Sequence, residues 1–137
     1  SILKWTGRIT GSAGLGLLFA SVGLGVIKIG KERRRRLHCA ISWFLLVFSS
    51  YHGFVLLIGP YSSLIFATNV MIGYASTIAM GIVSVNGLIE KWMTNVTSHT
   101  AWLWMHRVFI IVGIVLGLAH GILIGTDFAF IRKLLGM

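Results

Sequence analysis

Hydrophobic residues along the chain gather into four long stretches that are separated by short polar segments. Each stretch is close to the roughly 20 residues that an α-helix needs to cross the hydrocarbon core of a membrane. In lipid, the backbone has to satisfy its own hydrogen bonds, so each stretch is predicted to be helical. The pattern predicts helices at about residues 9–29, 37–59, 63–89 and 101–125.

The segments between these stretches determine the predicted topology. They read KERRRR, GPYSS and EKWMTNVTSH. Short connections make consecutive helices antiparallel, so the second and fourth helices are expected to run in the same direction. We therefore predict an all-α membrane protein whose residues 1–137 form a single up-down four-transmembrane-helix bundle.

The composition supports the membrane class. Hydrophobic residues make up 56% of the chain and charged residues only 11%, which is too few for the polar surface of a soluble domain of this size. The net charge of +9 is also typical of nucleic-acid binding, but here the basic residues adjoin apolar stretches, as in membrane-protein loops. The expected partner is the lipid bilayer and not nucleic acid. The single cysteine, Cys39, excludes a disulfide within the chain and is expected in the core.

The basic residues also predict an orientation. Eight of the twelve lie on the side of the first and third connections, namely Lys28, Lys31, Arg33, Arg34, Arg35, Arg36, Lys91 and Arg107. Cytoplasmic loops are enriched in Lys and Arg, so segments 30–36 and 90–100 are predicted on the cytoplasmic side of an inner or organellar membrane, with both chain ends opposite. Aromatic residues near the predicted span ends are expected at the membrane interface: Trp5, Tyr61, Trp92, Trp102 and Trp104.

Four of the five histidines lie in the second and fourth predicted helices, where each helix carries two that are fourteen residues apart: His38 and His52, then His106 and His120. Fourteen residues are close to four helical turns, so both histidines of a helix share one face, about 21 Å apart along the axis. Because the two helices are expected to be parallel, the spacing predicts a facing pair at each of two depths. His99, in a polar connection, is expected to be solvated.

Facing imidazoles in an apolar bundle are typical of a haem iron held from both sides. Neutral imidazole is a good iron ligand, and iron binding removes the cost of a polar ring in lipid. Zinc fits less well because two histidines at each depth are too few and no carboxylate or thiol lies in register. We predict two haem b groups, with the axial ligand pairs His38/His106 and His52/His120.

Three further residues are candidates for cofactor binding. Gly113 lies midway between the histidines of its helix and would leave room for a porphyrin face. Arg107 and Arg36 lie beside the His38/His106 depth and would pair with haem propionates, since guanidinium matches carboxylate geometry. The alternatives are small-residue helix packing for glycine, and topology or anionic-lipid contact for the arginines. Met80 is expected to pack in the core.

The sequence LH-x13-HG in the second helix, and the His-Arg and His-Gly pairs of the fourth, resemble the haem-binding helices of known families. These families are the ferric-reductase-like transmembrane domain and the cytochrome b/b6 group, in which two b-type haems stack between two helices with similarly spaced histidines. The resemblance implies a transmembrane cytochrome b domain. It extends to His38, His52, His106 and His120 and, more loosely, to Arg107 and Gly113.

A haem with two histidine ligands has no open iron position, which favours electron transfer over catalysis at the iron. The predicted function is electron transfer across the membrane, as a subunit of an oxidoreductase complex and not a self-contained enzyme. The sequence has no flavin or nucleotide motif, so a quinol or dehydrogenase partner and another redox protein are expected. The alternatives are a (bacterio)chlorophyll-binding subunit and a haem-free structural subunit of a larger complex.

Overall fold

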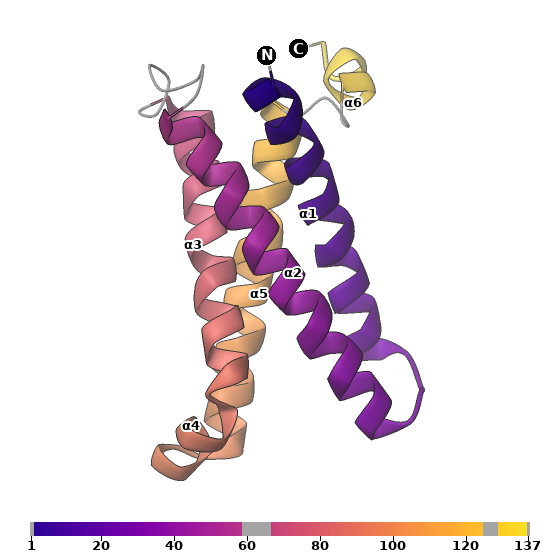
Figure 1. Cartoon of the computed structure of the whole chain (residues 1–137), viewed down its shortest axis with the longest axis vertical. Coiled ribbons are helices and arrows are strands. Elements are labelled where there is room, and N and C mark those ends of the chain that lie inside the picture. Colours follow the sequence, from indigo (N-terminus) through magenta and orange to yellow (C-terminus); the bar gives the residue numbers. More distant parts are fainter. Residues whose placement is uncertain (1, 59–66, 125–128, 137) are drawn as a thin grey trace.

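The structure is a computed structural model that describes residues 2–58, 67–124 and 129–136. Four helices dominate it: α1 (Ile2–Val26), α2 (Lys31–Ile58), α3 (Thr68–Leu88) and α5 (His99–Ile124) (Figure 1). Each is long and apolar enough to cross a membrane. The described residues contain no β-strand. The predicted all-α fold with four candidate membrane spans is confirmed.

The helices alternate in direction, and α2 and α5 run parallel, as Figure 1 shows. The closest packing is between α1 and α2 and between α3 and α5, while α2 also packs on α3. The bundle therefore consists of two antiparallel hairpins that meet along α2 and α3. The hairpins diverge toward the end where α2 begins (Figure 1), and α2 and α5 are not among the extensively packed pairs.

Two segments predicted as loops are helical. The arginine run belongs to α2, which begins after Gly30, whose carbonyl oxygen accepts from the Arg34 amide at 2.9 Å. Arg, Lys and Glu are good helix formers, so lipid is not needed to keep this turn helical. Likewise, much of EKWMTNVTSH forms α4 (Glu90–Val96). The GPYSS connection and the predicted start of the third helix at residue 63 lie outside the described residues.

A short helix, α6 (Ala129–Leu134), follows α5. The guanidinium of Arg132 donates a hydrogen bond to the carbonyl oxygen of Ile122 at 3.0 Å, which ties α6 to the end of α5. This helix lies near the N-terminal end of α1, so both ends of the chain are at the same end of the bundle (Figure 1).

Buried apolar side chains extend along the bundle, from Val55 and Val70 at one end to Val83 and Trp102 toward the other. Midway along the helices, Leu18, Leu45 and Met80 form a buried cluster, and Ile110 and Ile114 of α5 pack against it. The packing role predicted for Met80 is thus confirmed. Many apolar side chains are instead exposed on the outside of the helices, including Phe19, Phe44, Phe54, Ile78 and Ile111. Such an extensive apolar exterior is expected where the surroundings are lipid.

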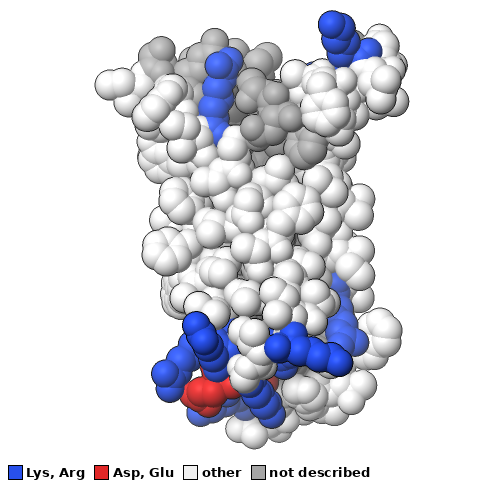
Figure 2. All heavy atoms as spheres, turned by 90° about the vertical axis from the view of Figure 1, so that its right-hand side faces the viewer, with Lys and Arg blue, Asp and Glu red and all other residues white. Residues whose placement is uncertain are grey.

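On the face that Figure 2 shows, charged side chains gather toward the two ends of the bundle, with an uncharged band between them. The end where α2 begins, called the basic end below, carries the arginine run, in which Arg36 pairs with Glu32 and Arg35 with Glu90. The opposite end, which holds both chain ends, carries Arg8, Arg132 and Lys133 and is called the chain end. This distribution is typical of a helical membrane protein.

Candidate functional site

Helices α2 and α5 bring four histidines together as two pairs. At the basic end, the rings of His38 and His106 face each other with centroids 6.2 Å apart and planes inclined by 62°. At the chain end, the rings of His52 and His120 lie 6.1 Å apart and are inclined by 77°. These are the pairs that the fourteen-residue spacing predicted, and they are called the basic-end pair and the chain-end pair.

The separation of the rings matches a metal ion between two imidazoles. A metal–imidazole bond is about 2 Å long, so the ring centroids on either side of one ion are roughly 6 Å apart. A direct N–H···N hydrogen bond of about 3 Å would bring the centroids to roughly 5 Å. Within the described residues no group of three or more His, Cys, Asp and Glu side chains is placed to hold a metal.

The chain-end pair is held by backbone contacts from the flanking helices. The Nδ1–H group of His52 donates a hydrogen bond to the carbonyl oxygen of Gly7 at 2.7 Å. A Cβ at Gly11 would lie 2.9 Å from Cε1 of His52, and one at Gly73 would lie 2.6 Å from Cε1 of His120. The hydrogen bond to Gly7 orients the ring of His52 and leaves Nε2 as the unprotonated nitrogen of the neutral imidazole, the form that binds a metal.

At the basic end, His38 is oriented by α1 in a similar way. Its Nδ1 lies 3.2 Å from the carbonyl oxygen of Ser21 and 3.2 Å from the Ser21 hydroxyl. The Ser42 hydroxyl donates to the carbonyl oxygen of His38 at 2.7 Å and lies 3.4 Å from that of Ser21. With Nδ1 donating to Ser21, Nε2 of His38 is left to bind a metal.

His106 is held differently. Its Nδ1 is buried and has no hydrogen-bond partner, and its ring stacks on Trp102 with centroids 5.4 Å apart and planes inclined by 21°. Trp102 is 8% exposed, so its predicted place at the membrane interface is wrong. Trp5, Trp92 and Trp104 are all more than 60% exposed near helix ends, as predicted for interface residues, and Tyr61 lies outside the described residues.

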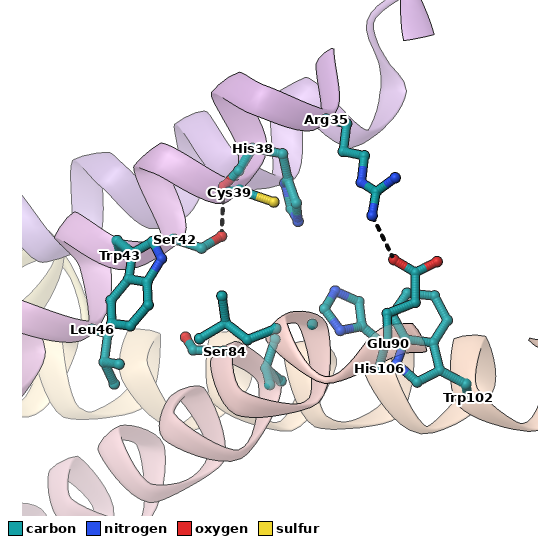
Figure 3. Close-up of a pocket in the computed structure, with 13 residues that line it drawn as sticks. Arg35, His38, Cys39, Ser42, Trp43, Leu46, Ser84, Glu90, Trp102 and His106 are labelled. Carbon is teal, nitrogen blue, oxygen red and sulfur yellow. Dashed lines mark hydrogen bonds and ion pairs between the residues drawn. The ribbon is translucent and has the colours of Figure 1, made fainter. Parts of the chain in front are cut away.

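A pocket opens between the two rings of the basic-end pair, and His38 and His106 point into it from opposite sides (Figure 3). Arg35 and Glu90 lie at its edge, where Nη2 of Arg35 is 3.9 Å from Oε2 of Glu90. Cys39 also lines the pocket and is exposed, so the expectation that it belongs to the core is wrong. Hydrophobic residues complete the wall: Trp43, Leu46, Val83 and Leu88.

The three secondary candidates are not placed around this pocket. Arg36 does not line it, and its largely exposed guanidinium pairs with Glu32 of the same helix at 3.2 Å. Arg107 is exposed and does not line it either. The arginine at the pocket is Arg35, which lies one residue earlier on α2 and therefore about 100° away from Arg36 around the helix.

Gly113 packs against α3. A Cβ at this position would collide with Sδ of Met80, and the Ser76 hydroxyl donates to the Gly113 carbonyl oxygen at 2.8 Å. The structure thus favours the helix-packing interpretation of Gly113 over room for a porphyrin. His99 begins α5 and is exposed, as expected, with its ring 5.5 Å from that of Trp102.

Comparison of the chain with protein-family models, with curated proteins and with solved structures gives no match. The interpretation of the site therefore depends on the geometry of the two histidine pairs and of the residues that hold them.

Proposed function

We propose that the chain is a dihaem membrane cytochrome that conducts electrons across the bilayer. The observation that carries the proposal is the pairing of four histidines on two parallel helices, with ring centroids 6.2 and 6.1 Å apart. His38 and His106 would hold one haem b, and His52 and His120 the other. When bound, such a haem supplies one-electron chemistry at an iron whose two axial positions are both taken by imidazole.

The residues around the pairs fit this role. Carbonyl oxygens of Gly7 and Ser21 accept hydrogen bonds from Nδ1 of His52 and His38, which orients these rings and increases their basicity as ligands. The two pairs are separated by fourteen residues along each helix, or about 21 Å along the axis. This separation would place one haem toward each surface of a membrane.

Arg35 is the best candidate to pair with a haem propionate. It lines the basic-end pocket together with His38 and His106, and its present partner, Glu90, is 3.9 Å away. That ion pair is long and partly exposed, so it is weak and exchangeable. The planar guanidinium lies at the edge of the pocket, where it could pair with a propionate carboxylate bound there.

Electrons would reach and leave the chain through partners. A quinol or a dehydrogenase subunit on one side and another redox protein on the other would make the chain a membrane subunit of an oxidoreductase complex. The concentration of Lys and Arg at the basic end supports a cytoplasmic location for that end, with both chain ends on the opposite side.

Single histidine substitutions test the ligand assignment. His106→Ala should remove the basic-end haem and His120→Ala the chain-end haem, so each variant should retain one haem per chain. The matched control is His99→Ala, which alters an exposed histidine at the start of the same helix and should retain both. Haem is measured as the pyridine haemochrome after purification in detergent. Equal haem content in all three variants would contradict the assignment, as would a pigment without redox-dependent bands.

A further inference from the structure

The hydrogen bonds that orient His38 and His52 have no counterpart at His106. The first two rings are each fixed by a backbone carbonyl of α1, whereas Nδ1 of His106 is buried without a hydrogen-bond partner. When one nitrogen of an imidazole binds a metal, the N–H group of the other nitrogen normally donates a hydrogen bond to an acceptor, which fixes the plane of the ring. Another contact must therefore hold the His106 ring in place.

Trp102 provides that contact. It lies four residues before His106 on α5, a spacing that places both side chains on one face of the helix. The two rings are nearly parallel, with an inclination of 21° and centroids 5.4 Å apart, as in an offset stack. The indole covers one face of the imidazole and restricts its rotation.

The indole is itself anchored to a second helix. Its Nε1–H group donates a hydrogen bond to the carbonyl oxygen of Asn86 at 2.9 Å. Asn86 lies in the last turn of α3, where backbone carbonyl groups lack partners within the helix, so this bond satisfies a group that would otherwise be unpaired. Trp102 thus links the α3 backbone to the ring of His106.

We propose that Trp102 is the positioning residue for His106, and that it sets the plane of this ring by stacking where the rings of His38 and His52 use a hydrogen bond. The proposal rests on the proposed haem function. Without an acceptor at Nδ1, His106 is also a less basic ligand than His52, so the basic-end haem should be bound less tightly and have the higher reduction potential.

The test compares Trp102→Leu and Trp102→Phe with the control Trp104→Leu, which alters an exposed tryptophan two residues further along α5. Two signals are measured: the low-spin ferric EPR spectrum, which responds to the angle between the axial imidazole planes, and the rate of haem transfer to excess apomyoglobin. Trp102→Leu should change the EPR signal of one haem, and that haem should leave the protein about 10-fold faster or more, as expected when a residue that orients a metal ligand is lost. Trp102→Phe, which keeps an aromatic face, should have a smaller effect.

The chain-end haem reports on the fold in every variant and should remain unchanged. Unaltered signals in Trp102→Leu would overturn the proposal, and so would equal effects of the Phe and Leu substitutions. Loss of both haems from Trp102→Leu would show that Trp102 supports the packing of the whole bundle, and this result would also overturn the proposal. Failure of the underlying haem function is distinct, because wild-type protein would then contain no haem.

Discussion

The two histidine pairs have nearly the same ring separation but differ in how the rings are held. Gly11 and Gly73 leave the space that the rings of the chain-end pair occupy, and a hydrogen bond of 2.7 Å to a backbone carbonyl fixes one of these rings. At the basic end the rings rely on Ser21 and Trp102, and a pocket with charged residues at its edge opens between them. A backbone carbonyl of α1 thus holds one ring in each pair, and the difference lies at His106, which a side chain holds instead.

The largest expected effect comes from filling the space beside a ring of the chain-end pair. A Cβ at Gly73 would lie 2.6 Å from the ring of His120, so Gly73→Ala should displace that ring and remove one of two haems. Gly81→Ala is the matched control on the same helix, because its Cβ would meet nothing within 4 Å. Haem per chain is measured for both. Two haems in Gly73→Ala would show that this ring is not confined as described.

The same comparison predicts that the two haems have different reduction potentials. A haem held by His38 and His106 would lie beside Arg35, and one of its proposed ligands, His106, has no hydrogen bond at Nδ1; both features would favour the reduced iron. A redox titration should therefore give two separate midpoints, with the higher one lost in His106→Ala. A single shared midpoint, or loss of the lower one, would contradict the account.

Arg35→Gln should lower the higher midpoint by a few tens of millivolts, because an exposed charge contributes about 1 kcal/mol or less and 59 mV corresponds to about 1.4 kcal/mol for one electron. Arg36→Gln is the control, since its guanidinium is outside the pocket and pairs with Glu32. The shift should shrink as salt is added. Equal shifts in both variants would show that the midpoint responds to the total charge of the basic end and not to Arg35 in particular.

The helix spans and the histidine register could be predicted from the sequence because both depend on local periodicity. An apolar stretch of sufficient length predicts a span, and the 3.6-residue period places His38 and His52 on one face. Neither signal depends on what the neighbouring helices contribute.

The residues that hold the rings could not be predicted because they act across helices. Nothing local shows that the Gly7 carbonyl meets His52 or that Gly73 adjoins His120. Trp102 looked like an interface residue because of its place near a span end, and its four-residue distance from His106 was the one local signal of the stack. Which of Arg35 and Arg36 faces the pocket depends on the rotation of α2 about its axis. Four consecutive arginines occur on all sides of the helix, so the sequence does not show which of them faces the pocket.

The smallest expected effect is on helix packing away from both pairs. Ser76→Ala removes the buried hydrogen bond to the Gly113 carbonyl and should lower the free energy of unfolding by about 1 kcal/mol while haem content stays unchanged. Ser50→Ala, at an exposed position of α2, is the control. The measurement is the unfolding midpoint in mixed detergent. A loss of haem from Ser76→Ala would mean that this contact belongs to the site.

The haem content of the purified wild-type chain tests the central claim most directly. Pyridine haemochrome analysis together with quantitative amino-acid analysis gives the number of haem b groups per chain. The facing pairs, with ring centroids 6.2 and 6.1 Å apart, predict two haems and a low-spin spectrum for both. A chain that folds in the membrane fraction and takes up no haem when haem is supplied would contradict it.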